Sequence, residues 1–246
     1  MIRGVRPGAT AAGSAAAAAW VLPAAAPLVP ALAGALRIAT RSALPGTVAL
    51  TFDDGPHRHG TPAVLEALAA AGARATFFLV GEQVERAPAL AAEVAAAGHA
   101  IAVHCHRHRN LLRLSPGSVR DDLERAAATI GAATGAAPTL HRAPFGIYSW
   151  PALRAVRRRG WAPVLWSRWG RDWTRRATGN SVAAKVAADL RPGDVLLLHD
   201  ADDYSAPGSW RATVAALPQV LEAVAAAGLR PAPVAGANDL AHASGR

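Results

Sequence analysis

From Val48 onward, short apolar runs alternate with longer segments whose apolar residues recur at helical spacing. The short runs predict strands over 48–52, 75–80, 100–103, 139–141, 161–166, 195–198 and 229–234. The segments between them predict helices over 61–71, 88–97, 115–134, 150–159, 181–190 and 213–227. Strands that alternate with helices in this way indicate a parallel sheet.

About seven strand–helix units over roughly 200 residues favour a closed or nearly closed sheet over an open one. We therefore predict an α/β fold, a distorted (β/α) barrel of about seven strands. In such barrels the chemistry lies at the carboxyl ends of the strands. Unusual polar residues that directly follow predicted strands are therefore the first candidates for a functional site.

The first forty residues have a different pattern. Two arginines precede an uncharged run over 7–36, which is long enough to span a bilayer but is rich in alanine and interrupted by three prolines. A basic start, an apolar centre over 15–22 and a small-x-small sequence at 31–33 are typical of a secretory signal. An uncleaved membrane anchor and a disordered leader are the alternatives.

This pattern divides the chain into three parts. We expect a signal peptide or membrane anchor with a linker over 1–45, one folded domain over 46–235, and a short tail over 236–246. The protein is then exported and extracellular or at the cell surface, with membrane association through the N-terminal segment if that segment is retained.

Composition narrows the function classes. The formal charge is +9, and every basic residue except Lys185 is arginine. The arginines are scattered, apart from the triplet 157–159, and no aromatic-basic stacking motif or helix-turn-helix pattern appears, so we expect no nucleic-acid partner. The single cysteine, Cys105, excludes an internal disulfide.

Polar clusters follow five of the predicted strands. The quoted stretches are TFDDGP at 51–56, HCHRH at 104–108, HRAPFG at 141–146, WSRWGRDW at 166–173 and HD at 199–200. Each has an ordinary explanation as a turn, a solvated loop or a cap. Their shared position after strands predicts that they meet at one rim of the barrel.

Histidine nitrogens and a carboxylate oxygen are the donors that suit Zn²⁺ and its neighbours, with a coordination position left open for water. The cation would also offset the repulsion between the adjacent carboxylates of Asp53 and Asp54. His104 and His106 would share a face of a continuing strand, whereas His104 and His108 would share a face of a helical turn. Spacing alone does not decide between these pairs.

Taken in order, TFDDGP, HxxxH, RxPxG, DW and LLLHD resemble the motifs of the polysaccharide deacetylase family, the NodB-homology domain of carbohydrate esterase family 4. The resemblance runs from Val48 to about Val234. It implies a metal-dependent hydrolase that removes N-acetyl groups from amino sugars of a cell-wall or extracellular polysaccharide, so that the partner is an N-acetylated glycan. It also implies one divalent metal ion, with Zn favoured and Co, Mn or Ni as alternatives.

The resemblance assigns a role to each matching residue. It implies Asp54, His104 and His108 as metal ligands. It implies catalytic roles for Asp53 as base, Arg142 as its orienting partner, His199 as acid and Asp172 as the partner of His199. It implies an oxyanion contact from the backbone N–H of Phe145 and pocket walls from Trp173 and Leu197. We expect Arg142 and the metal together to lower the pKa of Asp53, and Asp172 to raise that of His199 against the opposing charge of the metal.

Three positions depart from the family pattern. Cys105 stands where the family usually has Ser or Thr, and we interpret it as structural. Arg109 stands where a proline is usual, which predicts a less rigid ligand loop, and His106 adds a competing imidazole. A catalytically inactive glycan-binding protein on the same scaffold and a hydrolase of a non-sugar amide remain as alternative functions.

Overall fold

The structure is a computed structural model, and it describes residues 18–235. Its strands are β1 (Thr47–Asp53), β2 (Thr76–Leu79), β3 (Ala100–Val103), β4 (Leu140–His141), β5 (Ala162–Pro163), β6 (Arg168–Trp169), β7 (Val195–His199) and β8 (Arg230–Ala232). Its α-helices are α2 (Pro30–Ala35), α3 (Gly60–Ala70), α4 (Gly81–Arg86), α5 (Pro88–Ala96), α6 (Pro116–Thr134), α7 (Trp150–Arg158), α8 (Gly179–Val186) and α9 (Trp210–Ala226). Short 3₁₀ turns occupy η1 (Leu22–Ala25), η2 (Leu111–Arg113) and η3 (Pro144–Gly146).

The strands form one sheet in the order β5-β4-β3-β2-β1-β7-β6, and β8 pairs with the first residues of β1. Every pairing between these strands is parallel. This confirms the predicted distorted (β/α) barrel. Two elements differ from the prediction. The run over 161–166 contributes only β5 and is followed by a separate strand β6, and α4 occupies a segment without a predicted helix.

Strand β1 lies in the middle of the sheet and is fully buried. Leu50 and Phe52 pack in the large apolar core beneath the helices, whereas Ala49 belongs to a smaller cluster on the other face of the sheet. Because successive side chains of a strand point to opposite faces, Thr51 and Asp53 share the face of Ala49. The last residue of β1 therefore carries its carboxylate to the inner end of the barrel.

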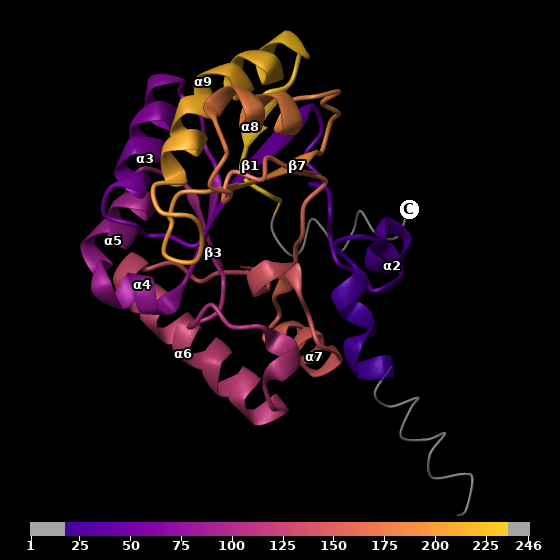
Figure 1. Cartoon of the computed structure of the whole chain (residues 1–246). Helices are drawn as coiled ribbons and strands as arrows, with labels where there is room; N and C mark the ends of the chain where they lie inside the picture. Colours follow the sequence, from indigo (N-terminus) through magenta and orange to yellow (C-terminus); the bar gives the residue numbers. More distant parts are fainter. Residues whose placement is uncertain (1–17, 236–246) are drawn as a thin grey trace, which may run out of the picture.

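The helices form a layer around the outside of the sheet (Figure 1). Contacts run from α8 to α9, then to α3, α5, α6 and α7. This layer of helices covers the helix-facing side chains of the strands. The site is therefore formed by the loops at the carboxyl ends of the strands.

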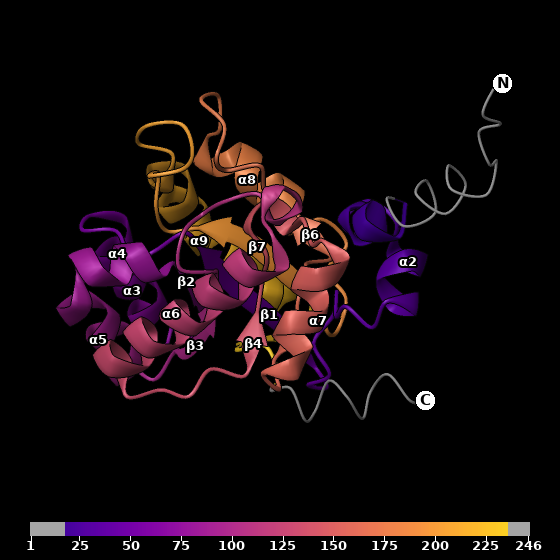
Figure 2. The same cartoon turned by 90° about the horizontal axis from the view of Figure 1, so that it is seen from below.

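The segment 18–45 packs against the domain, which corrects our expectation that it lies outside the fold. Figure 2 shows it beside α7, and η1 contacts that helix. Ala39 forms a parallel bridge with Val164, directly after β5, and Arg41 pairs with Asp194, directly before β7, at 2.6 Å. The segment thus joins the residues that follow β5, an edge strand of the sheet, to the residue that precedes β7.

The leader and tail predictions fall partly outside the structure. Residues 1–17 of the expected leader and the expected tail over 236–246 lie outside the described residues. Within 18–235, every helix is too short or too polar to cross a bilayer. Secretion or anchoring by the leader stays a prediction.

Candidate active site

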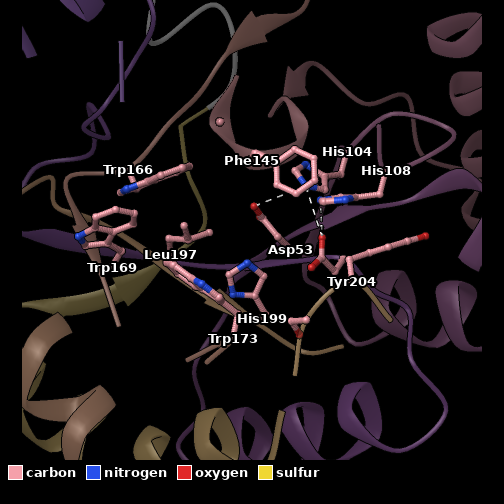
Figure 3. Close-up of a pocket in the computed structure, with 13 residues that line it drawn as sticks. Asp53, His104, His108, Phe145, Trp166, Trp169, Trp173, Leu197, His199 and Tyr204 are labelled. Atoms are coloured by element: carbon pink, nitrogen blue, oxygen red, sulfur yellow. Dashed lines mark ion pairs between the residues drawn. The ribbon is translucent and has the colours of Figure 1, made fainter. Parts of the chain in front are cut away.

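The polar residues that follow five strands meet at one end of the sheet, as Figure 3 shows. Asp53 ends β1 and pairs in register with His199, which ends β7. The loops after β3, β4 and β6 bring in the histidine, arginine and aspartate–tryptophan motifs. The convergence follows from the parallel sheet, because the carboxyl ends of all its strands point the same way.

These residues surround a pocket of about 280 Å³. Eight of the ten predicted site residues line it, and Arg142 and Asp172 lie buried behind them. The lining consists of Asp53, Asp54, His104, His108, Phe145, Gly146, Trp166, Trp169, Trp173, Leu197, His199, Tyr204 and Ser205. Most of the lining surface is therefore apolar or aromatic, with carboxylates and imidazoles at the base, as is usual for small-molecule sites.

Asp54, His104 and His108 present donor atoms within 4.8 Å of one another. Asp54 Oδ1 lies 3.5 Å from His104 Nε2 and 3.3 Å from His108 Nε2. His106 lies elsewhere: its Nε2 is 3.8 Å from a carboxylate oxygen of Glu85. Of the two histidine pairs that spacing left open, the structure thus places His104 and His108 beside Asp54, and not His104 and His106.

The donor set fits a divalent cation. Asp54 Oδ1 is buried and has no hydrogen-bond partner within residues 18–235, and burial raises the pKa of Asp54 to about 7. Burial also lowers the pKa of His104 and of His108 to about 3, so both imidazoles are neutral near pH 7. His104 Nδ1 lies 2.8 Å from the carbonyl oxygen of Arg142, to which it donates its N–H, so the Nε2 lone pair is free to bind a metal.

The loop that carries the two histidines is anchored by Asp122 of α6. The backbone N–H of His106 donates to Asp122 Oδ2 at 2.6 Å, and Arg109 Nη2 donates to Asp122 Oδ1 at 2.6 Å. Arg109 was expected to make this loop less rigid than a proline would. The structure instead gives it an ion pair with a buried carboxylate, which fixes the loop by another route.

Cys105 lies between the two ligand histidines but outside the pocket lining. Its side chain is fully buried, and Sγ lies 3.4 Å from Nε2 of His141. Burial raises the pKa of the thiol well above its usual range, so it stays protonated and unreactive. This agrees with a structural role.

Arg142 is fully buried and reaches Asp53 from behind. Its Nη1 donates to Asp53 Oδ1 at 2.6 Å and to Thr51 Oγ1 at 2.9 Å, and its Nη2 donates to the carbonyl oxygen of Leu165 at 2.9 Å. Burial nevertheless raises the pKa of Asp53, against the opposing charge of Arg142. Among the protein groups alone, desolvation thus outweighs the ion pair, which leaves a fixed carboxylate that is a stronger base than an exposed one. Our expectation of a lowered pKa counted on a bound metal as well as on Arg142, so it stays a prediction for the metal-loaded protein.

His199 and Asp172 form a second pair on the opposite wall. The imidazole Nδ1 lies 3.0 Å from Asp172 Oδ1, and Thr213 Oγ1 donates to Asp172 Oδ2 at 2.7 Å. Burial opposes the charged imidazolium, yet the charge and hydrogen bond of Asp172 raise the pKa of His199 to about 10. The same contacts hold the pKa of Asp172 below its ordinary value despite its burial. The pair supplies a protonated imidazole near neutral pH, as an acid requires.

Phe145 has a backbone φ of 61°, in the left-handed region, and its side chain is 55% exposed at the pocket mouth. Its ring meets that of His108 edge to face with centroids 4.5 Å apart. Leu197 is buried and Trp173 half-buried, and both line the pocket near His199. The structure thus places all three predicted oxyanion and wall residues around one space.

Sequence reasoning missed Tyr204. Its ring stacks on the imidazole of His108, with centroids 4.3 Å apart and planes 13° apart. The hydroxyl donates to Glu82 Oε1 at 2.6 Å and accepts from Gln83 Nε2 at 3.0 Å. The available signal was an aromatic residue in the loop that follows the strand-terminal His199.

Trp166 and Trp169 were also missed as pocket residues. Both lie in the quoted stretch 166–173, but the prediction used only its last two residues. Side chains alternate between the two faces of a strand, and this alternation turns Trp169 toward the pocket. It could not be predicted, because β6 was not predicted as a strand.

The chain is similar to known polysaccharide deacetylases. The polysaccharide deacetylase family model matches residues 41–164. A chitooligosaccharide deacetylase from Bradyrhizobium sp. (strain ANU 289) is 40% identical over 155 residues, which cover 63% of this chain and 70% of the relative. A peptidoglycan-N-acetylglucosamine deacetylase from Bacillus cereus is 31% identical over 173 residues, or 70% of this chain and 62% of the relative.

A solved structure gives the same result at the level of the fold. The crystal structure of the Bc1960 peptidoglycan N-acetylglucosamine deacetylase superposes with a TM-score of 0.74 at 28% identity, covering 80% of this chain and 90% of that chain. The family match, the relatives and the ordered motifs at one rim all agree. The chain belongs to the polysaccharide deacetylase family, the NodB-homology group of carbohydrate esterase family 4.

Proposed function

We propose that this protein is a metal-dependent hydrolase that removes N-acetyl groups from amino sugars of a cell-wall or extracellular polysaccharide. The relatives, by their names, act on chitooligosaccharides and on peptidoglycan N-acetylglucosamine. The observation that carries the proposal is that a general base and a general acid face the same pocket. The base is Asp53, which Arg142 holds in place, and the acid is His199, which Asp172 holds in place. Amide hydrolysis needs both groups, because water must lose a proton and the leaving amine must gain one.

Asp54, His104 and His108 would hold the cation. When bound there, a divalent ion supplies Lewis-acid polarisation of the acyl carbonyl and acidifies water. Zn²⁺ is the ion that best suits two neutral imidazoles and one carboxylate, with Co²⁺, Mn²⁺ and Ni²⁺ as alternatives.

The chain's own groups then account for the proton transfers. As the oxygen of water bonds to the acetyl carbon, Asp53 takes the proton from that water. The backbone N–H of Phe145 donates to the oxyanion that forms on the former carbonyl oxygen. His199 donates its Nε2 proton to the amide nitrogen as the C–N bond breaks. Acetate and a free amine leave, Asp53 releases its proton to solvent, and His199 takes one up.

Acetate release from a panel of N-acetylated glycans, with and without chelator, tests the proposal. We expect release that stops with chelator and returns with added metal. Asp53→Asn is the matched control, because it keeps the shape of the side chain and removes the base. A folded, metal-loaded protein that binds glycan without releasing acetate would instead be a glycan-binding scaffold, and release from a non-sugar amide alone would reassign the substrate.

We also propose that the chain is exported, on the basis of its basic start and uncharged N-terminal run. Fractionation of cells that express the full chain tests this. Recovery in the medium or at the cell surface is expected, and cytoplasmic protein with an intact N-terminus would contradict it.

A further inference from the structure

Three tryptophans form a continuous aromatic wall along one side of the pocket, visible in Figure 3. The Trp166 and Trp169 rings stack with centroids 5.9 Å apart, and the Trp169 and Trp173 rings lie 5.6 Å apart at 49°. Trp173 in turn meets the imidazole of His199 edge to face at 5.4 Å. The wall therefore begins at the proposed acid and leads away from it, with Trp169 as its most exposed member.

Trp169 is held in place by its strand. β6 pairs with β7 in a register that puts Trp169 beside Leu197. The side chain of the preceding residue, Arg168, is held by Asp194, with Nε 3.2 Å from Oδ2. Because neighbouring side chains of a strand point to opposite faces, Trp169 is turned toward the pocket. The backbone at Gly170 is pressed against α8, where an added Cβ would lie 2.7 Å from Val182 Cγ1, so β6 has little room to move.

Trp169 is 42% exposed although the chain places it next to a large apolar core. Another tryptophan, Trp150 on α7, is 38% exposed and lies outside the pocket. Trp169 differs from Trp150 in its position, because only Trp173 lies between Trp169 and the proposed acid, His199. Flat aromatic faces fixed by neighbours bind apolar surfaces at a small cost in conformational entropy.

We propose that Trp169 is the platform for a second sugar ring, the neighbour of the ring whose acetamide lies at His199. The inference rests on the proposed function and adds to it a residue, Trp169, that distinguishes an oligomer from a single sugar. Pyranose rings of β-linked amino sugars present faces of C–H groups with their hydroxyls at the edge. Such a face stacks on an indole and leaves the hydroxyls in water.

The wall sets the order of the subsites. The acetamide-bearing ring lies against Trp173 and Leu197, where the acetyl group reaches Asp53 and His199. The next ring along the chain lies over Trp169. Contacts at Trp169 are the same before and during the chemical step, so they lower KM for oligomers and leave kcat unchanged.

The test compares Trp169→Ala and Trp169→Phe with wild type on N-acetylglucosamine monomer and tetramer, all metal-loaded. We expect KM for the tetramer to rise about tenfold in Trp169→Ala, the loss typical of one aromatic stack, so that kcat/KM falls about tenfold more for the tetramer than for the monomer. Trp169→Phe should recover most of the affinity. Trp150→Ala is the matched control and should change nothing, and melting curves check that each variant is folded.

A binding arm separates this inference from the proposed function. In an Asp53→Asn background, tetramer binding is measured by calorimetry with and without Trp169→Ala. Weaker binding in the double variant supports the platform even if wild type proves inactive on every glycan. Tetramer affinity that is the same with Trp and Ala at position 169 overturns the inference, whether or not the protein deacetylates.

Discussion

His199 is bound at two points by Asp172: its backbone N–H donates to Oδ2 at 2.7 Å, and its ring Nδ1 lies 3.0 Å from Oδ1. The two bonds fix both the rotation of the imidazole and its tautomer, so Nε2 is the nitrogen available to the substrate. Since Asp172 is itself 1% exposed, its charge acts at close range with little screening by water.

We expect Asp172→Asn to move the basic limb of the pH–rate profile to lower pH. Burial lowers the pKa of His199, whereas Asp172, with smaller contributions from Asp54 and Asp53, raises it to about 10. The acid must be protonated, so the rate falls as pH rises through that pKa, and without the aspartate the fall comes earlier. The rate itself should drop on the order of 10²–10⁴-fold, as for loss of general acid–base catalysis. Acetate release across pH for both proteins measures it.

Metal content is the control for this variant and should not change. A neighbouring cation lowers the pKa of His199, so the comparison is made between equally loaded proteins. The stabilisation that His199 gains from Asp172 is fully present below pH 6.5 and is lost as pH rises through about 10. An unmoved basic limb would mean that Asp172 does not tune the acid.

His108→Ala should remove the bound metal, whereas His106→Ala should leave it in place. His108 Nε2 lies 3.3 Å from Asp54 Oδ1, while the His106 ring faces Glu85 and packs on Gly81. Metal analysis after dialysis should give about one ion per chain for wild type and for His106→Ala. The reverse pattern would reassign the ligand.

Tyr204→Leu should weaken metal binding about tenfold, in line with other groups that orient a metal ligand. No side-chain hydrogen bond within residues 18–235 orients the His108 ring, which is instead packed between Tyr204 and Phe145. Tyr204→Phe keeps the stack and loses the bonds to Glu82 and Gln83, so its effect should be smaller. Chelator competition gives the affinities. Equal affinity in wild type and Tyr204→Leu would show that the stack does not position the ligand.

Deletion of residues 1–33 should destabilise the domain. Ala26 and Ala33 are buried, and Pro27 lies against Gly146 of the Phe145 loop. A loss of about 2 kcal/mol would lower the melting temperature by roughly 4–8 °C in a protein of this size. Calorimetry of the deletion variant checks it. An unchanged melting temperature would mean that the segment is only placed on the domain and adds no stability.

The fold could be predicted because segments with the apolar spacing of a strand and of a helix alternate regularly along the chain. The site could be placed because five polar clusters each follow a strand. Asp53 and His199 could therefore be placed at one rim without coordinates. Spacing alone could not choose His108 over His106, because that choice depends on the turn that the chain takes at Cys105, where φ is 66°. No propensity predicts a positive φ at a cysteine.

The features that the sequence did not predict, β6 and the position of Tyr204, have a common physical origin. β6 is two residues long and is fixed by its pairing with β7, and Tyr204 reaches His108 through a loop anchored on Glu82 and Gln83. Both are tertiary arrangements with little local signal. The effect of burial on the pKa of Asp53 could not be predicted for a related reason, because the sequence names its partner Arg142 but not the depth at which the two are buried.

The strap formed by residues 38–42 has a consequence for the order in which the molecule is assembled. It is synthesised before any strand of the sheet, yet its partners come much later: Arg41 binds Asp194, 153 positions along the chain. Until its partners have been made, this stretch has nothing to pair with, and its residue Ile38 and the preceding Ala33 have no surface on which to be buried. The first part of the domain to be made is therefore among the last to find its place. Until β7 and the residues before it have been made, the N-terminal segment lacks the anchor that Asp194 gives to Arg41.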